Sequence, residues 1–324
     1  MKITRRQAVA GIAATTFSVP AFVRVARAND LIRIAIPQKG NWDSMVTVQG
    51  DEEGFFKKAG IDLDITYTSG GSDTIQVAAT GGVDIAMATG TTAVIGAFAH
   101  GAPVRIISAQ FTGAPDLYWY VRADSPIKSM ADMNGKTMAF SRPGSSTFIV
   151  SHLLAKRANV TPNFVSAGEQ PATRTMVMSG QLDAGWASAP TNFDLLNDKK
   201  IRIIARGADV PEIRNQTIRV NFANQKFLTA KRDVAVRFLK IYAQTIDWMY
   251  RDTDAALKRY VGWNPTITPA MARQALSFFP KSALSLTVSG FDASLADALT
   301  YKSIDKPLTP EQAKEIFSVV YAER

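Results

Sequence analysis

The chain contains the segment TGGVDIAMAT at residues 80–89, and a related segment, SGQLDAGWAS, follows at residues 179–188. In each copy a Ser or Thr followed by Gly ends a predicted helix, because Gly readily takes the left-handed conformation that caps a helix C-terminus. A short apolar strand then begins directly after an Asp. The match between the copies is therefore conformational rather than catalytic.

The same order of elements precedes each copy. A predicted strand, at residues 32–36 before the first copy and 137–141 before the second, leads into a polar loop, a helix, a second strand and a further helix. Two similar α/β lobes explain this duplication. Because small molecules commonly bind in clefts between lobes, the repeat also predicts a binding cleft.

Two predicted strands carry the chain between the lobes, at residues 117–121 and, on the return, at residues 217–222. We therefore predict a first lobe (lobe 1) built from residues 29–120 and 221–324, and a second (lobe 2) from residues 121–220. The C-terminal part is mostly helical, and aromatic residues at helical spacing usually fill cores. We expect the following aromatic residues to pack this part onto lobe 1: Trp248, Tyr250, Tyr260, Trp263, Phe278 and Phe279.

The first 28 residues have the pattern of a secretory signal peptide. Basic residues precede an apolar stretch at residues 8–23 that is too short to span a bilayer, and Ala26-Arg27-Ala28 matches an A-x-A cleavage site. Arg5 and Arg6 also resemble the twin-arginine signal. We expect cleavage after Ala28 and a periplasmic protein. The sequence has no Cys, so it predicts neither a lipidated Cys nor disulfides.

The formal net charge of +9 overstates the charge of the exported protein, because five basic residues lie in the signal segment. Without them, 32 basic residues stand against 28 acidic ones, a net charge of +4. The basic residues are scattered rather than gathered on one stripe, so we expect no nucleic-acid partner. Neither His100 nor His152 has the spacing of a metal ligand, so we expect no metal and no cofactor.

Several short motifs occur in an order that is similar to a known family. They are GFFKKAGIDL at 54–63, SGGS at 69–72, KSMADMNGK at 128–136 and GSS at 144–146, together with the two repeats. Over residues 31–250 the chain resembles the nitrate/sulfonate/taurine group of ABC-transporter substrate-binding proteins. The resemblance implies the α/β, two-lobed type II periplasmic binding fold, with each lobe a mixed sheet flanked by helices. It also implies a monomeric receptor that passes a small-molecule solute to an ABC permease in the inner membrane.

Ligands of open α/β sheets bind beyond the carboxyl ends of the strands, where helix N-termini point their N–H groups. Applied to both lobes, this rule selects the loops that the family uses. For any single Ser or Thr there, a role as helix N-cap is the competing interpretation. Arg142 and Arg174 are candidates to neutralise an anionic solute, and a solvated or interlobe position is the competing interpretation for each. The expected ligand contacts are Gln38, Trp42, Ser69, Gly71, Ser72, Gly90, Thr91, Ser145, Ser146, Thr147 and Trp186.

The leading hypothesis is a receptor, not an enzyme, whose lobes close on a small organic anion such as a sulfonate or carboxylate. The alternative solute is a neutral aromatic heterocycle of the pyrimidine type, stacked between Trp42 and Trp186. An enzyme of the pyrimidine-precursor synthase type is a different class, but that relative depends on Cys, which this chain lacks. The effector lobe of a transcription regulator is a third class. The signal peptide and the missing helix-turn-helix argue against it.

Overall fold

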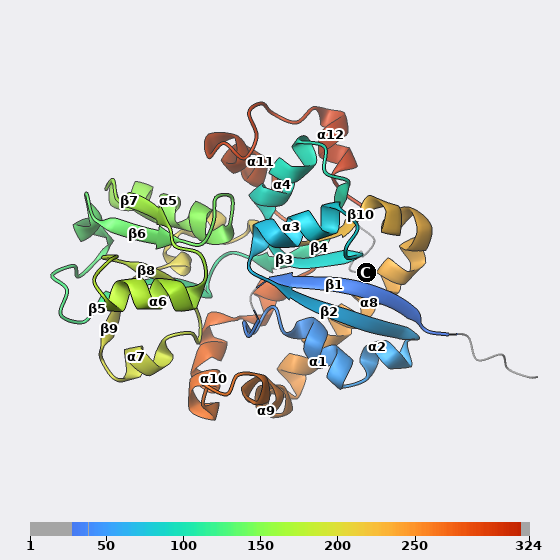
Figure 1. The fold of residues 1–324 in the computed structure, drawn as a ribbon, viewed down its shortest axis with the longest axis horizontal. Coiled ribbons are helices and arrows are strands. Elements are labelled where there is room, and N and C mark those ends of the chain that lie inside the picture. The colour runs from blue at the N-terminus through green and yellow to red at the C-terminus, as the bar shows by residue number, and fades with distance from the viewer. Residues whose placement is uncertain (1–27, 38, 319–324) are drawn as a thin grey trace, which may run out of the picture.

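The chain forms two α/β lobes that lie side by side (Figure 1). The structure is a computed structural model that describes residues 28–37 and 39–318. The predicted signal segment, apart from Ala28, lies outside the described residues, and so does Gln38. Across the two described ranges, no helix is long and apolar enough to cross a membrane.

The sheet of lobe 1 has five strands in the order β2-β1-β3-β10-β4. β1 runs parallel to β2 and β3, and β10 is antiparallel to both of its neighbours. Most of β1 is buried, as expected for a parallel strand with helices over both faces. The strands are β1 (Asp30–Pro37), β2 (Ile61–Thr68), β3 (Ile85–Gly90), β4 (Val104–Thr112) and β10 (Thr217–Asn224).

Lobe 2 repeats this arrangement. β6 pairs with β7 in parallel, and β5 pairs antiparallel with β8 and β9. A backbone bridge between Met138 and Ala184 joins the two parts, and the N–H of Ala139 donates to the Ala184 carbonyl at 2.9 Å. The order β7-β6-β8-β5-β9 therefore matches that of lobe 1, with the crossing strand in the fourth place of each. The strands are β5 (Leu117–Arg122), β6 (Thr137–Phe140), β7 (Asn163–Ser166), β8 (Gly185–Ser188) and β9 (Ile201–Arg206).

The Gly residues of the repeated segment cap the two equivalent helices, α3 (Gly71–Ala79) and α6 (Gln170–Met178). Gly81 has a φ of 79° and Gly180 a φ of 80°, both in the left-handed region that favours Gly. The predicted helix ends are therefore confirmed in both lobes.

The Asp of each copy fixes the strand that follows it against the first strand of its lobe. Asp84 Oδ2 accepts the backbone N–H of Arg33 on β1 at 2.9 Å. Asp183 Oδ2 accepts the backbone N–H of Thr137 on β6 at 2.8 Å. The repeated segment therefore has a structural role at the start of a strand, in agreement with the interpretation from sequence.

Helices cover both faces of the lobe 1 sheet, with α3 and α4 on one side and α1, α2 and α8 on the other (Figure 1). The segment from Val46 to Lys58 forms two helices instead of one, because Gly54 takes a φ of 70° between them. The remaining helices are α1 (Val46–Glu52), α2 (Phe55–Lys58), α4 (Thr91–Ala99), α5 (Ser146–Ala158), α7 (Phe193–Asn197), α8 (Gln225–Arg251), α9 (Thr253–Trp263), α10 (Pro269–Ala275), α11 (Phe291–Thr300) and α12 (Pro310–Glu315), with 3-10 turns η1 (Met130–Met133), η2 (Gly207–Asp209), η3 (Pro211–Ile213), η4 (Leu276–Phe278) and η5 (Lys281–Leu284).

Most C-terminal aromatic residues pack onto lobe 1, as predicted. Trp248 meets Phe55 edge to face with ring centroids 5.9 Å apart, and Tyr260 meets Trp42 at 5.3 Å. These rings pack α8 and α9 against the part of lobe 1 that contains α1 and α2.

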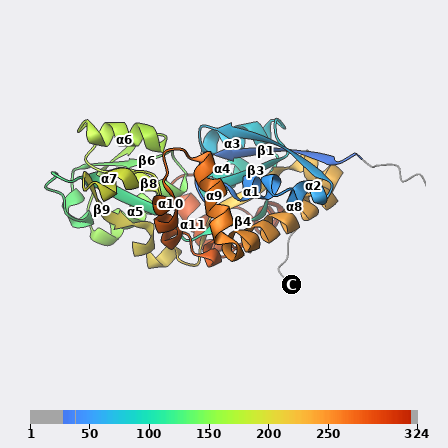
Figure 2. The ribbon, with the colours of Figure 1, turned by 90° about the horizontal axis from the view of Figure 1, so that it is seen from below.

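Phe278 contradicts the prediction, because it packs on lobe 2. Its ring lies 6.2 Å from Tyr118 and 5.5 Å from Phe193, and the guanidinium of Arg206 sits 3.9 Å above it. Tyr301, directly after α11, contacts Phe148 of lobe 2 at 5.8 Å. The C-terminal segment thus reaches both lobes, and Figure 2 shows α10 and α11 between them.

Both predicted lobe boundaries fall inside strands. β5 (residues 117–122) pairs only with strands of lobe 2, and β10 (residues 217–224) pairs only with strands of lobe 1. We therefore propose that the chain crosses between the lobes just before Leu117 and just before Thr217.

We predict that Asp183→Ala destabilises the protein by about 1–3 kcal/mol, because it leaves the backbone N–H and the hydroxyl of Thr137 without their acceptor. Urea unfolding followed by circular dichroism measures this loss. Asp198→Ala, which removes an exposed carboxylate paired with Lys200, is the control and changes the free energy of unfolding by less than about 0.5 kcal/mol. Equal losses in the two variants contradict the role given to Asp183.

Candidate functional site

A cleft between the lobes is lined by residues from both of them. About 60 Å³ of it is open to the centres of water molecules, room for several waters or a small solute. Its lining residues are Pro37, Asn41, Asp43, Ser44, Gly71, Ser72, Ala88, Thr89, Gly90, Ala93, Asp116, Leu117, Ser141, Arg142, Pro143, Ser145, Ser146, Thr147, Trp186, Ser188 and Arg219.

Two helices point their N-termini into this cleft, α3 from lobe 1 and α5 from lobe 2. Ser145 is the N-cap of α5, and its hydroxyl accepts the N–H of Phe148 at 3.1 Å. The N–H groups of Ser146 and Thr147 belong to the first turn and have no acceptor within the helix. α3 begins at Gly71 after Gly70, with no side-chain cap. Each lobe therefore offers backbone donors and a positive helix end to an anion.

The hydroxyl groups at the start of α5 bind one another. Ser141 and Thr147 hydroxyls are 2.8 Å apart, Ser145 and Thr147 hydroxyls are 2.9 Å apart, and the N–H of Ser141 donates to the Thr147 hydroxyl at 2.9 Å. This network fixes the loop, so we expect the backbone N–H groups, more than the hydroxyls, to be available to a solute.

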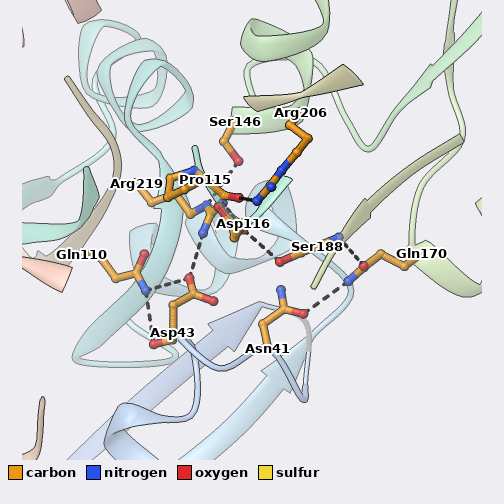
Figure 3. Close-up of polar contacts among 10 residues, drawn as sticks. All are labelled: Asn41, Asp43, Gln110, Pro115, Asp116, Ser146, Gln170, Ser188, Arg206 and Arg219. Carbon is orange, nitrogen blue, oxygen red and sulfur yellow. Dashed lines mark hydrogen bonds and ion pairs between the residues drawn. The ribbon is translucent and has the colours of Figure 1, made fainter. Parts of the chain in front are cut away.

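Arg219 on β10 lies on the floor of the cleft, buried between two carboxylates (Figure 3). Its Nη1 donates to Asp43 Oδ2 at 2.8 Å, and its Nη2 donates to both oxygens of Asp116 at 2.7 and 2.8 Å. The guanidinium also lies 4.8 Å from the ring centroid of Phe111. Because the guanidinium already pairs with both carboxylates, Arg219 is not available to neutralise an anionic solute.

Burial and ion pairing both shift the pKa values of Asp116 and Arg219. Burial raises the pKa of Asp116; Arg219 opposes that shift and the charge of Asp43 adds to it. Burial alone would lower the pKa of Arg219, but its ion pairs with Asp116 and Asp43 outweigh burial and raise it. Two carboxylates therefore face one guanidinium in this cluster.

A chain of hydrogen bonds runs from the cluster across the cleft (Figure 3). The hydroxyl of Ser188 on β8 donates to Asp116 Oδ2 at 2.8 Å, and its N–H donates to Gln170 Oε1 at 2.7 Å. Gln170 Nε2 in turn donates to Asn41 Oδ1 in lobe 1 at 3.3 Å. Lobe 2 is therefore bonded to lobe 1 at two points, Ser188 with Asp116 and Gln170 with Asn41.

The lobes also contact each other at the N-terminus of α4. The hydroxyl of Thr92 donates to the carbonyl of Gly144 at 2.9 Å. A Cβ on Gly90 would lie 2.7 Å from the same carbonyl oxygen, so only Gly allows this approach. These contacts describe a closed arrangement of the two lobes.

One wall of the cleft has an unusual backbone. Ala88 has a φ of 50°, in the left-handed region that non-Gly residues seldom adopt. Its N–H donates to Asn221 Oδ1 at 3.3 Å, beside a register shift between β3 and β10. This irregularity interrupts the pairing of β3 with β10, which resumes at Thr89 and Gly90 beside the cleft, and β-bulges often lie next to binding sites.

Most of the predicted contacts line the cleft, and four described ones do not. Gln38 lies outside the described residues. Trp42, Ser69, Thr91 and Arg174 are absent from the lining. The predicted residues in the lining are Gly71, Ser72, Gly90, Ser145, Ser146, Thr147, Trp186 and Arg142.

Trp42 belongs to the core of lobe 1 instead. Its ring packs against Tyr250 and Tyr260, and its Nε1 donates to the Tyr250 hydroxyl at 3.3 Å. It therefore does not face Trp186, and a solute cannot be stacked between the two indoles in this arrangement. Trp186 itself is buried at the cleft, with no hydrogen-bond partner for its Nε1 among the described residues.

Arg174 and Thr91 have structural partners of their own. Arg174 donates to both carboxylate oxygens of Asp194 at 2.7 and 3.0 Å, within lobe 2. The hydroxyl of Thr91 donates to the Thr217 carbonyl at 2.7 Å. Neither residue is in the lining of the cleft.

Asp43, Asp116 and Arg219 line the cleft but were not predicted from the sequence. The position of Arg219 could have predicted a buried ion pair, because a cation in a buried strand needs carboxylate partners. Nothing in the local pattern shows that those partners are Asp43 and Asp116, which lie 176 and 103 residues away.

The chain belongs to the family whose model is described as NMT1/THI5 like, and the match covers residues 41–256. This agrees with the resemblance drawn from the sequence motifs. Among curated proteins, no sequence matches this chain.

Solved structures of periplasmic binding proteins share its fold. The alkanesulfonate-binding protein SsuA from Xanthomonas axonopodis pv. citri, bound to MOPS, is 19% identical with a TM-score of 0.73, over 89% of this chain and 99% of that one. The periplasmic aliphatic sulphonate binding protein SsuA from Escherichia coli is 17% identical with a TM-score of 0.68, over 88% and 91%. The desulfurization enzyme DSZB is 15% identical with a TM-score of 0.64, over 90% and 97%. The two-lobed binding-protein fold is therefore confirmed.

Glu169, the N-cap residue of α6 in lobe 2, faces lobe 1 beside the cleft. A Cβ on Gly70 would lie 3.2 Å from Glu169 Oε1 and 3.9 Å from Arg142 Nε. Burial raises the pKa of Glu169 from 4.5 to about 7; Arg142 opposes this shift and the charge of Asp73 across the cleft adds to it. The protonated carboxyl is therefore the form that the closed lobes favour.

We predict that Glu169 makes the stability of the protein depend on pH. Because its pKa is higher in the folded protein, its contribution is complete below pH 4.5 and is lost as the pH rises to about 7. Allowing for its partial exposure, the wild type should lose about 2 °C more in melting temperature over this range than Glu169→Gln. Differential scanning calorimetry measures the difference, and Asp305→Asn, at an exposed carboxylate, is the control. Parallel pH profiles of wild type and Glu169→Gln contradict this assignment.

Proposed function

We propose that the chain is a periplasmic receptor that captures a small organic anion, a sulfonate or a carboxylate, in the interlobe cleft and delivers it to an ABC permease. The observation that carries the proposal is a closed cleft between two lobes with unpartnered donors in its walls. The receptor fold supports it, and so do the relatives named as sulfonate-binding proteins.

The donors that would hold the anion come from both lobes. Trp186 Nε1 and Arg142 Nε are buried in the cleft lining and have no hydrogen-bond partner among the described residues. The first turns of α3 and α5 add backbone N–H groups and their helix dipoles. An anion placed among these groups would satisfy donors that otherwise stay buried and unpaired, which is costly.

Binding without turnover is the simpler interpretation of this cleft. The alternative of an enzyme of the pyrimidine-precursor synthase type requires Cys, and this chain has none. The neutral heterocycle of the pyrimidine type loses one of its two expected walls, because Trp42 packs against Tyr250 and Tyr260. We therefore retain the organic anion as the proposed solute.

Export rests on the N-terminal signal pattern. A receptor delivered to the periplasm meets its solute outside the inner membrane and the permease at that membrane. Closure of the lobes would present the permease with a surface that the open form lacks.

A thermal-shift screen of the mature protein against sulfonates, carboxylates and pyrimidines tests the proposal, because a ligand that binds only the folded state raises the melting temperature. We expect stabilisation by members of the first two groups. Stabilisation by pyrimidines alone, or turnover of a bound compound, contradicts the proposed function.

We predict that Trp186→Phe weakens solute binding by about tenfold while the fold is kept, because an aromatic ring is retained but the indole N–H donor and part of the indole surface are lost. Calorimetric titration measures the affinity. Trp119→Phe is the matched control, since Trp119 Nε1 donates to the Ala139 carbonyl at 2.9 Å and lies outside the cleft lining. It should lower stability and leave affinity unchanged. Equal affinity of Trp186→Phe and the wild type contradicts a contact between Trp186 and the solute.

A further inference from the structure

One carboxylate oxygen in the cleft has no partner among the described residues. Asp43 Oδ2 accepts from Arg219 Nη1 at 2.8 Å and from Gln110 Nε2 at 2.9 Å, whereas its Oδ1 is buried and accepts nothing. The side chain of Asp43 is 1% exposed and lines the cleft. Figure 3 shows Oδ1 turned away from both donors.

The other carboxylate of the cluster is different. Asp116 Oδ1 accepts from Arg219, and its Oδ2 accepts from both Arg219 and Ser188. Of the four carboxylate oxygens in the cluster, Asp43 Oδ1 is therefore the one that no donor reaches among the described residues. A buried ionic oxygen without a donor is costly, and closing the cleft removes the water that would otherwise serve it.

We infer that Asp43 selects a solute that carries a nitrogen donor group, an ammonium or an N–H, in addition to its anionic group. This inference rests on the proposed function and narrows its solute class. The donor group pairs with Asp43 Oδ1, and the anionic group takes the donors of Trp186 and Arg142. An alkanesulfonate or alkanoate without a nitrogen donor would pair with Trp186 and Arg142 but would leave Asp43 Oδ1 without a partner.

Two pairs of solutes of equal length test the inference. Propane-1-sulfonate is compared with 2-aminoethanesulfonate, and butanoate with 3-aminopropanoate, so that each pair differs by a methyl against an ammonium group. In the wild type we expect the amino member to bind about tenfold or more tightly than its partner, measured by calorimetric titration. In Asp43→Asn this ratio should fall to about one or below.

Asp116→Asn is the matched control. It removes the same charge from the same cluster, but from a carboxylate whose oxygens are already paired. It should keep most of the preference for the amino member. Because each variant is judged by the ratio of two affinities, a general loss of stability does not imitate the result.

The outcomes separate the inference from the function on which it rests. A wild type that binds the donor-free member as tightly as the amino member overturns the selection by Asp43 and leaves the receptor function standing. Equal loss of preference in Asp43→Asn and Asp116→Asn also overturns it, because net charge then explains the selectivity. A wild type that binds no sulfonate and no carboxylate overturns the proposed function and this inference with it.

Discussion

The buried guanidinium of Arg219 requires carboxylate partners, and this requirement organises the whole cleft. Removing one partner of a buried ion pair typically costs about 3–5 kcal/mol, so the three groups must stay together. Asp43 follows β1, Asp116 precedes the crossing into β5, and Arg219 lies on β10 just after the return crossing. The cluster therefore ties both crossing segments to the floor of lobe 1.

Around this cluster the chain uses one arrangement twice. Each lobe has its first, second and third strands in the same order, with a strand from a crossing in fourth place. The N-termini of α3 and α5 hold different places in the two lobes but line the same cleft, so donors from both halves converge on one small volume. The contacts of Thr92 with Gly144 and of Ser188 with Asp116 then join the halves in the closed form. A solute held there is enclosed by both lobes.

The fold was predictable because its signals are local. Gly81 and Gly180 end their helices through a conformation that only nearby residues decide, and the apolar strands that follow are read directly from the sequence. The position of Trp42 depends on residues that are distant in sequence. It packs in the core against Tyr250 and Tyr260, more than 200 residues away. The ion cluster is hidden for the same reason, since three charges distant in sequence meet only after folding. The prediction for Phe278 was wrong because helical spacing predicts that its side chain is buried, but not which of the two lobes it packs against.

The most direct test of this account is the distance between the lobes in solution with and without solute. The chain has no Cys, so Lys57→Cys on α2 and Lys156→Cys on α5, both exposed, can carry spin labels without further changes. Electron double resonance should show one short, narrow distance distribution with solute bound, and a longer, broader one without it. Identical distributions in the presence and absence of a solute that calorimetry shows to bind would contradict closure of two lobes on a captured molecule.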